Sequence, residues 1–139
     1  MKDTNPITVQ ITINAALANV WSAWTTPQEV MHWNRPFSHW HCPVAEINLT
    51  EQGTFLLRME AKDGSEGFDH AGQYDKILLH ERIEYTTKEG RKSKILFTSD
   101  GNSTKVRETF EPDSSISFKE QRAFVDNILA NFKKHVENR

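Results

Sequence analysis

The sequence predicts an α+β fold in which a curved antiparallel sheet of about seven strands wraps around one long C-terminal helix, with two short helices after the first strand. Three observations support this prediction. Residues 7–13 alternate apolar and polar side chains at every position, as a half-buried strand does. Further short alternating segments follow, separated by turn dipeptides such as Asp63-Gly64. Residues 117–136 keep apolar side chains at helical spacing and predict a helix of about 20 residues, roughly 30 Å long.

The N-terminal segment predicts a strand and then two short helices. One face of the strand is formed by Ile7, Val9, Ile11 and Ile13. The period then becomes helical, because apolar side chains recur at i, i+3, i+4 and i+7 in Leu17, Val20, Trp21 and Trp24. Thr26-Pro27-Gln28-Glu29 has the pattern of a capping box with proline at the first helical position, so a second short helix is expected to begin there.

The rest of the chain predicts a loop, six strands and the long helix. Pro36 and Pro43 bound a run of aromatic and imidazole side chains, so residues 34–43 are expected to form an irregular loop. The strands are predicted at residues 44–49, 54–61, 68–77, 81–87, 93–99 and 104–110. Ser117-Phe118-Lys119-Glu120 is a second capping box and predicts the start of the helix. With no linker or repeat, residues 1–139 are expected to form a single domain.

Composition narrows the functional classes. The chain has 17 basic and 19 acidic side chains and a formal net charge of −2, so a dedicated nucleic-acid-binding protein is not expected. No apolar run approaches the roughly 18 residues of a membrane-spanning helix, and the alternating N-terminal strand lacks the apolar core of a signal peptide. The single Cys42 cannot form an internal disulfide, which is typical of a reducing compartment. We therefore expect a cytoplasmic protein that does not bind membranes, as a monomer or a homodimer.

Six segments spread over almost the whole chain form a further pattern: Val20-Trp21-Ser22-Ala23-Trp24-Thr25-Thr26-Pro27, Trp40-His41-Cys42-Pro43, Met59-Glu60-Ala61-Lys62-Asp63-Gly64, Gly67-Phe68-Asp69, Thr104-Lys105-Val106 and Asn131-Phe132-Lys133-Lys134. With these motifs the chain resembles the bacterial branch of the family similar to the activator of heat-shock-protein-90 ATPase. That family belongs to the superfamily of START domains, the birch pollen allergen and polyketide cyclases (SRPBCC). The resemblance implies a helix-grip fold with a hydrophobic cavity under the C-terminal helix, no common cofactor or reaction, and a chaperone as one candidate partner.

Strand and helix periodicity predicts which side chains face this cavity. The expected apolar walls are Leu57, Met59, Tyr74 and Phe97 from the sheet and Phe124 and Val125 from the helix. The resemblance places Trp33 and Trp40 at the cavity mouth. Two titratable side chains, His70 and Glu108, interrupt the otherwise apolar set.

Three functions are compatible with these residues. The leading hypothesis is binding of a small hydrophobic or amphipathic ligand in the cavity. An enzyme of the polyketide cyclase or hydrolase type would use Glu108 and His70 for proton transfer, although no established catalytic motif is visible. A chaperone-associated or other protein-interaction module would need no cavity. The structural alternative for the two titratable groups is an ion pair of Glu108 with Arg122 and a hydrogen bond from His70 to a neighbour.

No metal site and no cofactor are predicted. His32, His39, His41 and Cys42 offer zinc ligands, but their spacing matches no recognised metal-binding module. A nucleophilic Cys42 would need an activating base and an oxyanion hole, and no motif around it supplies them. We therefore expect Cys42 to pack as a small buried hydrophobic residue.

Overall fold

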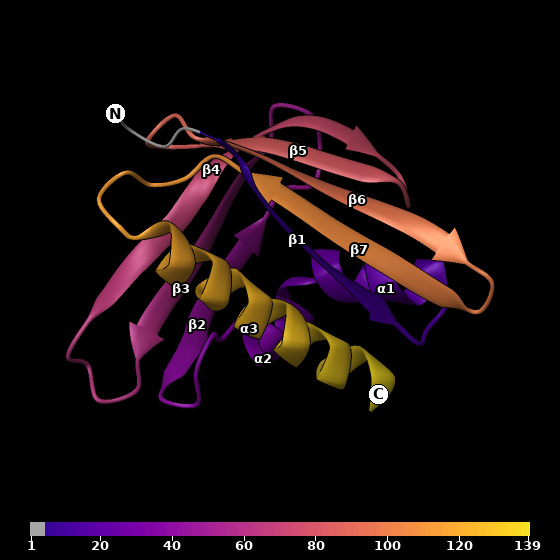
Figure 1. The fold of residues 1–139 in the computed structure, drawn as a ribbon, viewed down its shortest axis with the longest axis horizontal. Helices are drawn as coiled ribbons and strands as arrows, with labels where there is room; N and C mark the ends of the chain where they lie inside the picture. The colour runs from indigo at the N-terminus through magenta and orange to yellow at the C-terminus, as the bar shows by residue number, and fades with distance from the viewer. Residues whose placement is uncertain (1–4) are drawn as a thin grey trace.

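The computed structural model describes residues 5–139 and confirms the predicted order of one strand, two short helices, six strands and one long helix (Figure 1). The helices are α1 (Leu17–Thr25), α2 (Pro27–Trp33) and α3 (Phe118–Glu137). The strands are β1 (Ile7–Ile13), β2 (Trp40–Ile47), β3 (Thr54–Ala61), β4 (Gly67–Leu78), β5 (Arg82–Thr87), β6 (Lys92–Asp100) and β7 (Ser103–Phe110). The architecture is an α+β helix-grip fold, in which the sheet curls around α3.

The seven strands form one antiparallel sheet in the order β1-β7-β6-β5-β4-β3-β2. The register shifts between His41 and Val44 in β2 and between Tyr74 and Lys76 in β4. Such irregularities bend a strand and increase its twist. They contribute to the curvature with which the sheet faces α3 across its concave side (Figure 1).

Helix α3 packs closely on β1, α1 and α2 and stands away from the central strands. Its C-terminal half buries Leu129, Phe132 and Val136. The Phe132 ring meets Trp24 and Trp33 with centroid separations of 5.0 and 4.8 Å, and these edge-on aromatic contacts fill that end of the fold. In the N-terminal half of α3, Phe124 meets the rings of Trp40 and Phe68 at longer centroid separations of 6.5 and 6.2 Å.

The predicted loop over residues 34–43 is wrong in its second half, because β2 already begins at Trp40. Trp40 pairs with Ala61 and His41 with Glu60 of β3, so the segment alternates buried and partly exposed side chains as a strand does. Pro43 lies where the register shifts in this edge strand, a position at which the missing N–H is tolerated.

One of the two predicted helix caps is confirmed. The Ser117 hydroxyl accepts a hydrogen bond from the Glu120 N–H at 3.1 Å, and α3 starts there. The predicted cap by Thr26 is wrong, because its hydroxyl donates to the Ser22 carbonyl at 2.7 Å. Thr26 lies directly between α1 and α2. Its side chain therefore hydrogen-bonds to the last turn of α1 and does not cap α2.

Candidate functional site

A cavity of about 1020 Å³ lies between the concave face of the sheet and the N-terminal half of α3. Its walls are mostly apolar and aromatic, and they include Val30, Phe55, Ile83, Ile95 and Ile128. Near the surface the lining includes Phe37, Phe68 and Ile116, each with about two fifths of its surface exposed (43%, 41% and 45%). The cavity therefore has a mostly apolar interior, and apolar side chains form part of its rim.

Nine of the ten predicted site residues line this one cavity: Trp33, Trp40, Leu57, Met59, His70, Tyr74, Glu108, Phe124 and Val125. Phe97 does not line it, which corrects the prediction. Its ring packs against Trp21 and Trp24 of α1, with centroid separations of 5.0 and 5.9 Å. Strand alternation placed Phe97 correctly on the concave face, but α1 covers that end of the sheet. A role of the nine residues in ligand binding stays a prediction.

His70 lies on β4 and faces the cavity beside Tyr85 of β5. Its Nε2 and the Tyr85 hydroxyl are 3.2 Å apart, within hydrogen-bond distance. The imidazole also packs against the Phe55 ring at a centroid separation of 5.3 Å. Burial, aided by the positive charge of Arg91, lowers the pKa of His70 to about 4. The imidazole is therefore neutral at physiological pH.

Glu108 lies on β7, directly between Val9 of β1 and Ile95 of β6, which are both 1% exposed. Within residues 5–139 its carboxylate makes no hydrogen bond or ion pair, and the surface that it retains faces the cavity. This apolar enclosure raises the pKa of Glu108 to about 7. Burial raises the pKa of Tyr85, and the nearby Glu108 carboxylate raises it further.

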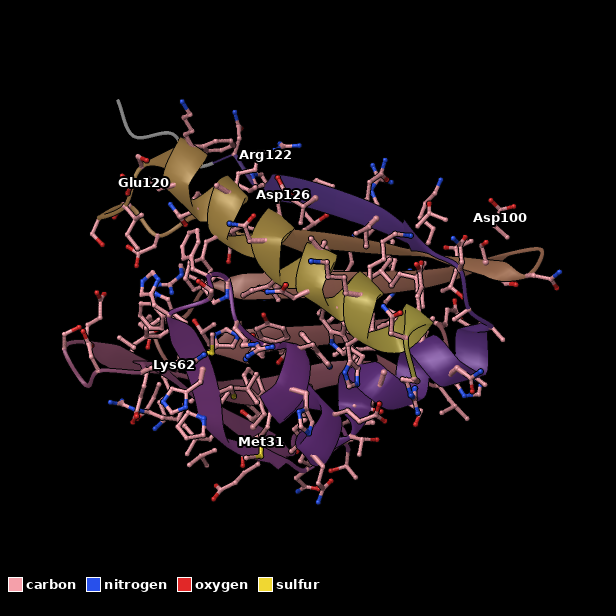
Figure 2. The ribbon with its side chains drawn as sticks, turned by 90° about the horizontal axis from the view of Figure 1, so that it is seen from below. Met31, Lys62, Asp100, Glu120, Arg122 and Asp126 are labelled. Atoms are coloured by element: carbon pink, nitrogen blue, oxygen red, sulfur yellow. The ribbon has the colours of Figure 1, made fainter. Side chains whose placement is uncertain are left out.

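The structural alternative of a Glu108–Arg122 ion pair is wrong. Arg122 is half exposed on α3, and its Nε lies 4.0 Å from Oδ2 of Asp126 on the same helix (Figure 2). Glu108 and His70 share the cavity, but no ion pair joins them in the described part of the chain. Tyr85 interacts with both groups, because its hydroxyl lies within hydrogen-bond distance of His70 and its phenol interacts electrostatically with Glu108.

Strand alternation places Tyr85 on the predicted cavity-facing side of its strand, but neither Tyr85 nor Arg91 is among the predicted binding residues. Tyr85 alternates with Ile83 on β5, so strand periodicity alone carried a signal for it. Arg91 follows Gly90 in the turn between β5 and β6, where no periodicity fixes the direction of a side chain. Both residues line the cavity.

The histidines and the cysteine considered as metal ligands point in different directions. His39 stacks on Phe37, His41 lies 3.5 Å from Glu60, and Cys42 is buried. Among the described side chains, no three histidine, cysteine, aspartate or glutamate residues gather as a metal site would require. Burial raises the pKa of the Cys42 thiol, which disfavours the reactive thiolate.

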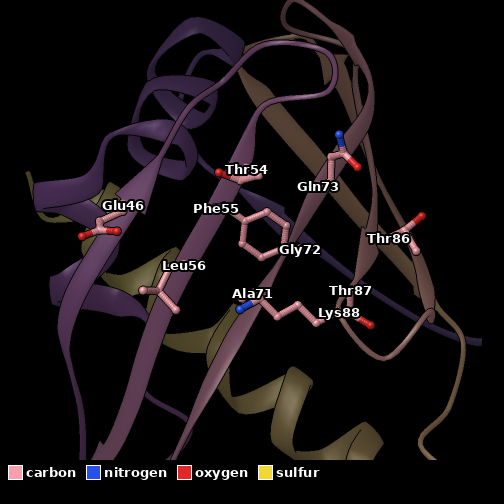
Figure 3. Close-up of a pocket in the computed structure, with 10 residues that line it drawn as sticks. All are labelled: Glu46, Thr54, Phe55, Leu56, Ala71, Gly72, Gln73, Thr86, Thr87 and Lys88. Atoms are coloured by element: carbon pink, nitrogen blue, oxygen red, sulfur yellow. The ribbon is translucent and has the colours of Figure 1, made fainter.

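A second hollow of about 510 Å³ opens at β3, β4 and β5, and its outer-face residues include Leu56, Gln73 and Lys88 (Figure 3). Gly72 lies on β4 beside the Phe55 ring. A Cβ atom at Gly72 would lie 2.3 Å from the Thr86 carbonyl oxygen, so only glycine fits between these strands. Gly72 is therefore a close-approach position and a poor place for a substitution meant to fill the large cavity.

This combination of sheet, helix and cavity can now be compared with known proteins. A family model described as Activator of Hsp90 ATPase homolog 1-like protein matches residues 14–135. The chain belongs to this family. The predicted family resemblance is thereby confirmed.

Several solved structures have the same fold. An AHSA1-like protein from Aeromonas hydrophila is 34% identical, with a TM-score of 0.86 over 95% of this chain and 93% of the other. A protein from Cytophaga hutchinsonii is 40% identical, with a TM-score of 0.83 over 96% and 93% of the two chains. A Nitrosomonas europaea protein at 13% identity and a TM-score of 0.83, covering 99% and 97%, shares the fold alone. No curated protein matches the chain.

Within residues 5–139, no helix combines the length and the hydropathy needed to cross a bilayer.

Proposed function

We propose that this protein binds a small, largely apolar ligand that carries a polar group, and that it does so in the cavity between α3 and the sheet. The observation that carries the proposal is the cavity itself. Protein cores rarely contain voids larger than a water molecule. A space of about 1020 Å³ that is lined by aromatic and aliphatic side chains is instead the size of a ligand pocket, for which about 300–1,000 Å³ is usual.

The polar side chains inside the cavity are few and are grouped. His70, Tyr85 and Glu108 stand among apolar neighbours, and ligand pockets combine apolar walls with a few such orienting groups. The apolar rim of Phe37, Phe68 and Ile116 supports entry from this side, because exposed apolar patches often mark interaction sites.

A fluorescent apolar probe, 1-pyrenemethanol, tests the proposal by titration. The wild-type protein is expected to bind it with saturation. Leu57→Trp places a large side chain into the cavity and is expected to weaken binding by about tenfold or more, equivalent to about 1.4 kcal/mol. Leu57 is only partly buried because it faces the empty space, so the variant is expected to fold.

Leu56→Trp is the matched control, because Leu56 is the neighbouring residue on the opposite face of β3 and lines only the outer hollow. It is expected to leave the affinity for the probe unchanged. Equal affinities of wild type and a folded Leu57→Trp variant would refute binding in this cavity.

A second candidate function is acid–base catalysis on the bound ligand. It is favoured by the position of Glu108, a carboxyl group without a partner in residues 5–139 that lines the apolar cavity between Val9 and Ile95. Burial there raises the pKa of Glu108 to about 7, so that it can exchange protons near neutrality. If Glu108 is catalytic, Glu108→Gln abolishes turnover of an identified substrate while the protein still binds it. Unchanged turnover in that variant would eliminate this candidate.

A further inference from the structure

We propose that the preferred ligand is an apolar amine, whose ammonium group pairs with the Glu108 carboxylate while its apolar body lies against the aromatic walls. This inference rests on the proposed function and specifies its ligand class. It is carried by the charges around the cavity, by the unpaired carboxylate inside it and by the shortage of free positive charge.

The cavity lining is strongly acidic. It contains one basic side chain, Arg91, and seven acidic ones: Glu66, Asp69, Glu89, Glu108, Glu111, Asp113 and Glu120. Since the whole chain has a formal net charge of only −2, the residues outside the lining carry a net positive charge. Acidic groups are therefore concentrated around this cavity, where they attract cations and repel anions.

The one arginine of the lining is already engaged. Its guanidinium lies 3.3 Å from Glu89 and 3.8 Å from Asp113. Asp69 pairs with Arg58 at 3.2 Å, and the Glu111 carboxylate accepts a hydrogen bond from the Lys92 N–H, whereas Glu66 and Glu120 form no ion pair or side-chain hydrogen bond within the described chain. An anionic ligand would thus meet surplus carboxylates and a neutralised arginine, while a cationic ligand would meet free carboxylates at the rim.

Glu108 is the side chain inside the cavity that pairs with the ammonium group of the ligand. Its cross-strand neighbours Val9 and Ile95 offer no hydrogen bond, and the carboxylate faces the empty space without a partner in residues 5–139. A buried ionised group without a partner is costly, whereas removing charges from water is offset when an opposite charge lies at hydrogen-bond distance. An ammonium group supplies both the charge and the N–H donors, which a carbonyl or carboxylate ligand lacks.

The aromatic walls of the cavity can bind the apolar body of such a ligand. The rings of Trp33, Trp40 and Tyr85 line the cavity, and aromatic faces attract organic cations as well as apolar surface. Trp40 forms edge-on contacts with Phe68 and Phe124 near the mouth, with centroid separations of 5.9 and 6.5 Å. These contacts form an aromatic cluster in the lining of the cavity.

Three probes with one apolar body separate charge from hydrophobicity: 1-pyrenemethylamine, 1-pyrenemethanol and 1-pyrenecarboxylate. Their affinities are measured by fluorescence titration at pH 8 and low ionic strength. The amine is expected to bind about ten times tighter than the alcohol, and the carboxylate more weakly than both. A carboxylate affinity equal to or above that of the amine overturns the inference.

Glu108→Gln keeps the shape of the side chain and removes its charge. It is expected to weaken binding of the amine by about tenfold and to change binding of the alcohol by less than about threefold. Glu46→Gln is the matched control, because Glu46 lies at the outer hollow and outside the cavity lining, and it is expected to preserve all three affinities. An amine-to-alcohol ratio that Glu108→Gln leaves unchanged overturns the pairing of the ammonium group with Glu108.

The two proposals fail in different ways. If all three probes bind with equal affinity, the ligand-binding cavity stands and the preference for amines is refuted. If none of them binds, the proposed function is refuted together with the inference.

Discussion

The substitution Glu108→Gln probes the stability of the fold as well as its ligand. In the folded protein the apolar surroundings raise the pKa of Glu108 to about 7, from its ordinary value of 4.5. The folded state therefore binds the proton more tightly than the unfolded state does. The unfolding free energy falls as pH rises from about 4.5 to about 7, and the destabilisation is complete above pH 7. Glutamine carries no charge at any pH and escapes this loss.

The size of the effect follows from the two pKa values. At about 1.4 kcal/mol for each pKa unit, ionised Glu108 destabilises the fold by at most about 3 kcal/mol at pH 8 and by about 1 kcal/mol at pH 5. Any packing cost of the glutamine amide is the same at both pH values. The stability of Glu108→Gln relative to wild type is therefore expected to be about 2 kcal/mol more favourable at pH 8 than at pH 5.

Urea denaturation of both proteins at pH 5 and pH 8 measures this difference. The other titratable groups at the cavity, which include His70, Tyr74, Tyr85, Arg91 and Glu120, are common to both proteins and cancel in the comparison. Glu46→Gln, the same carboxyl-to-amide change outside the cavity lining, serves as the control. A relative stability of Glu108→Gln that is equal at the two pH values would refute the enclosed, apolar environment of Glu108.

Three further predictions concern stability, each measured by urea denaturation. Burial lowers the pKa of His70 to about 4 in the folded state, so the unfolding free energy of wild type is expected to fall by about 2 kcal/mol more than that of His70→Phe between pH 6.5 and pH 4.5. Equal losses in the two proteins would contradict this. Phe132→Ala removes a fully buried ring and is expected to cost about 3–5 kcal/mol, whereas Ile128→Ala, at the cavity wall, costs about 2 kcal/mol; the reverse order would contradict the packing of α3. Thr104→Val deprives the Ala15 carbonyl of its 2.9 Å hydrogen bond and is expected to cost about 1–3 kcal/mol, whereas unchanged stability would show that the bond contributes nothing.

Most of the fold was predictable because apolar side chains recur at the strand or helix period within its segments. The alternation over residues 7–13 and the helical spacing over 117–136 correspond to β1 and α3. The start of β2 at Trp40 was missed, because two prolines and adjacent aromatic residues imitate a loop. Pairing with β3 outweighs that local signal, and only the tertiary structure supplies it.

The candidate site was predictable to the level of a sheet face. Alternation identifies the face on which Glu108 and Phe97 lie, and both do lie on the concave side. It does not reveal that α1 covers Phe97 or that Arg122 points to solvent, since both depend on how the helices are placed across the sheet. The close approach of β5 to Gly72 likewise arises only when the strands are paired.

Amide chemical-shift mapping by NMR tests the central claim most directly, because it locates the bound probe. The protein is titrated with 1-pyrenemethanol, and the perturbed amides are assigned. Binding in the cavity predicts perturbations that saturate together at residues 121–128 of α3 and around Leu57, His70 and Tyr85 on the sheet. Perturbations restricted to the outer hollow, around Leu56, Gln73 and Lys88, or no perturbation at all, would contradict the account.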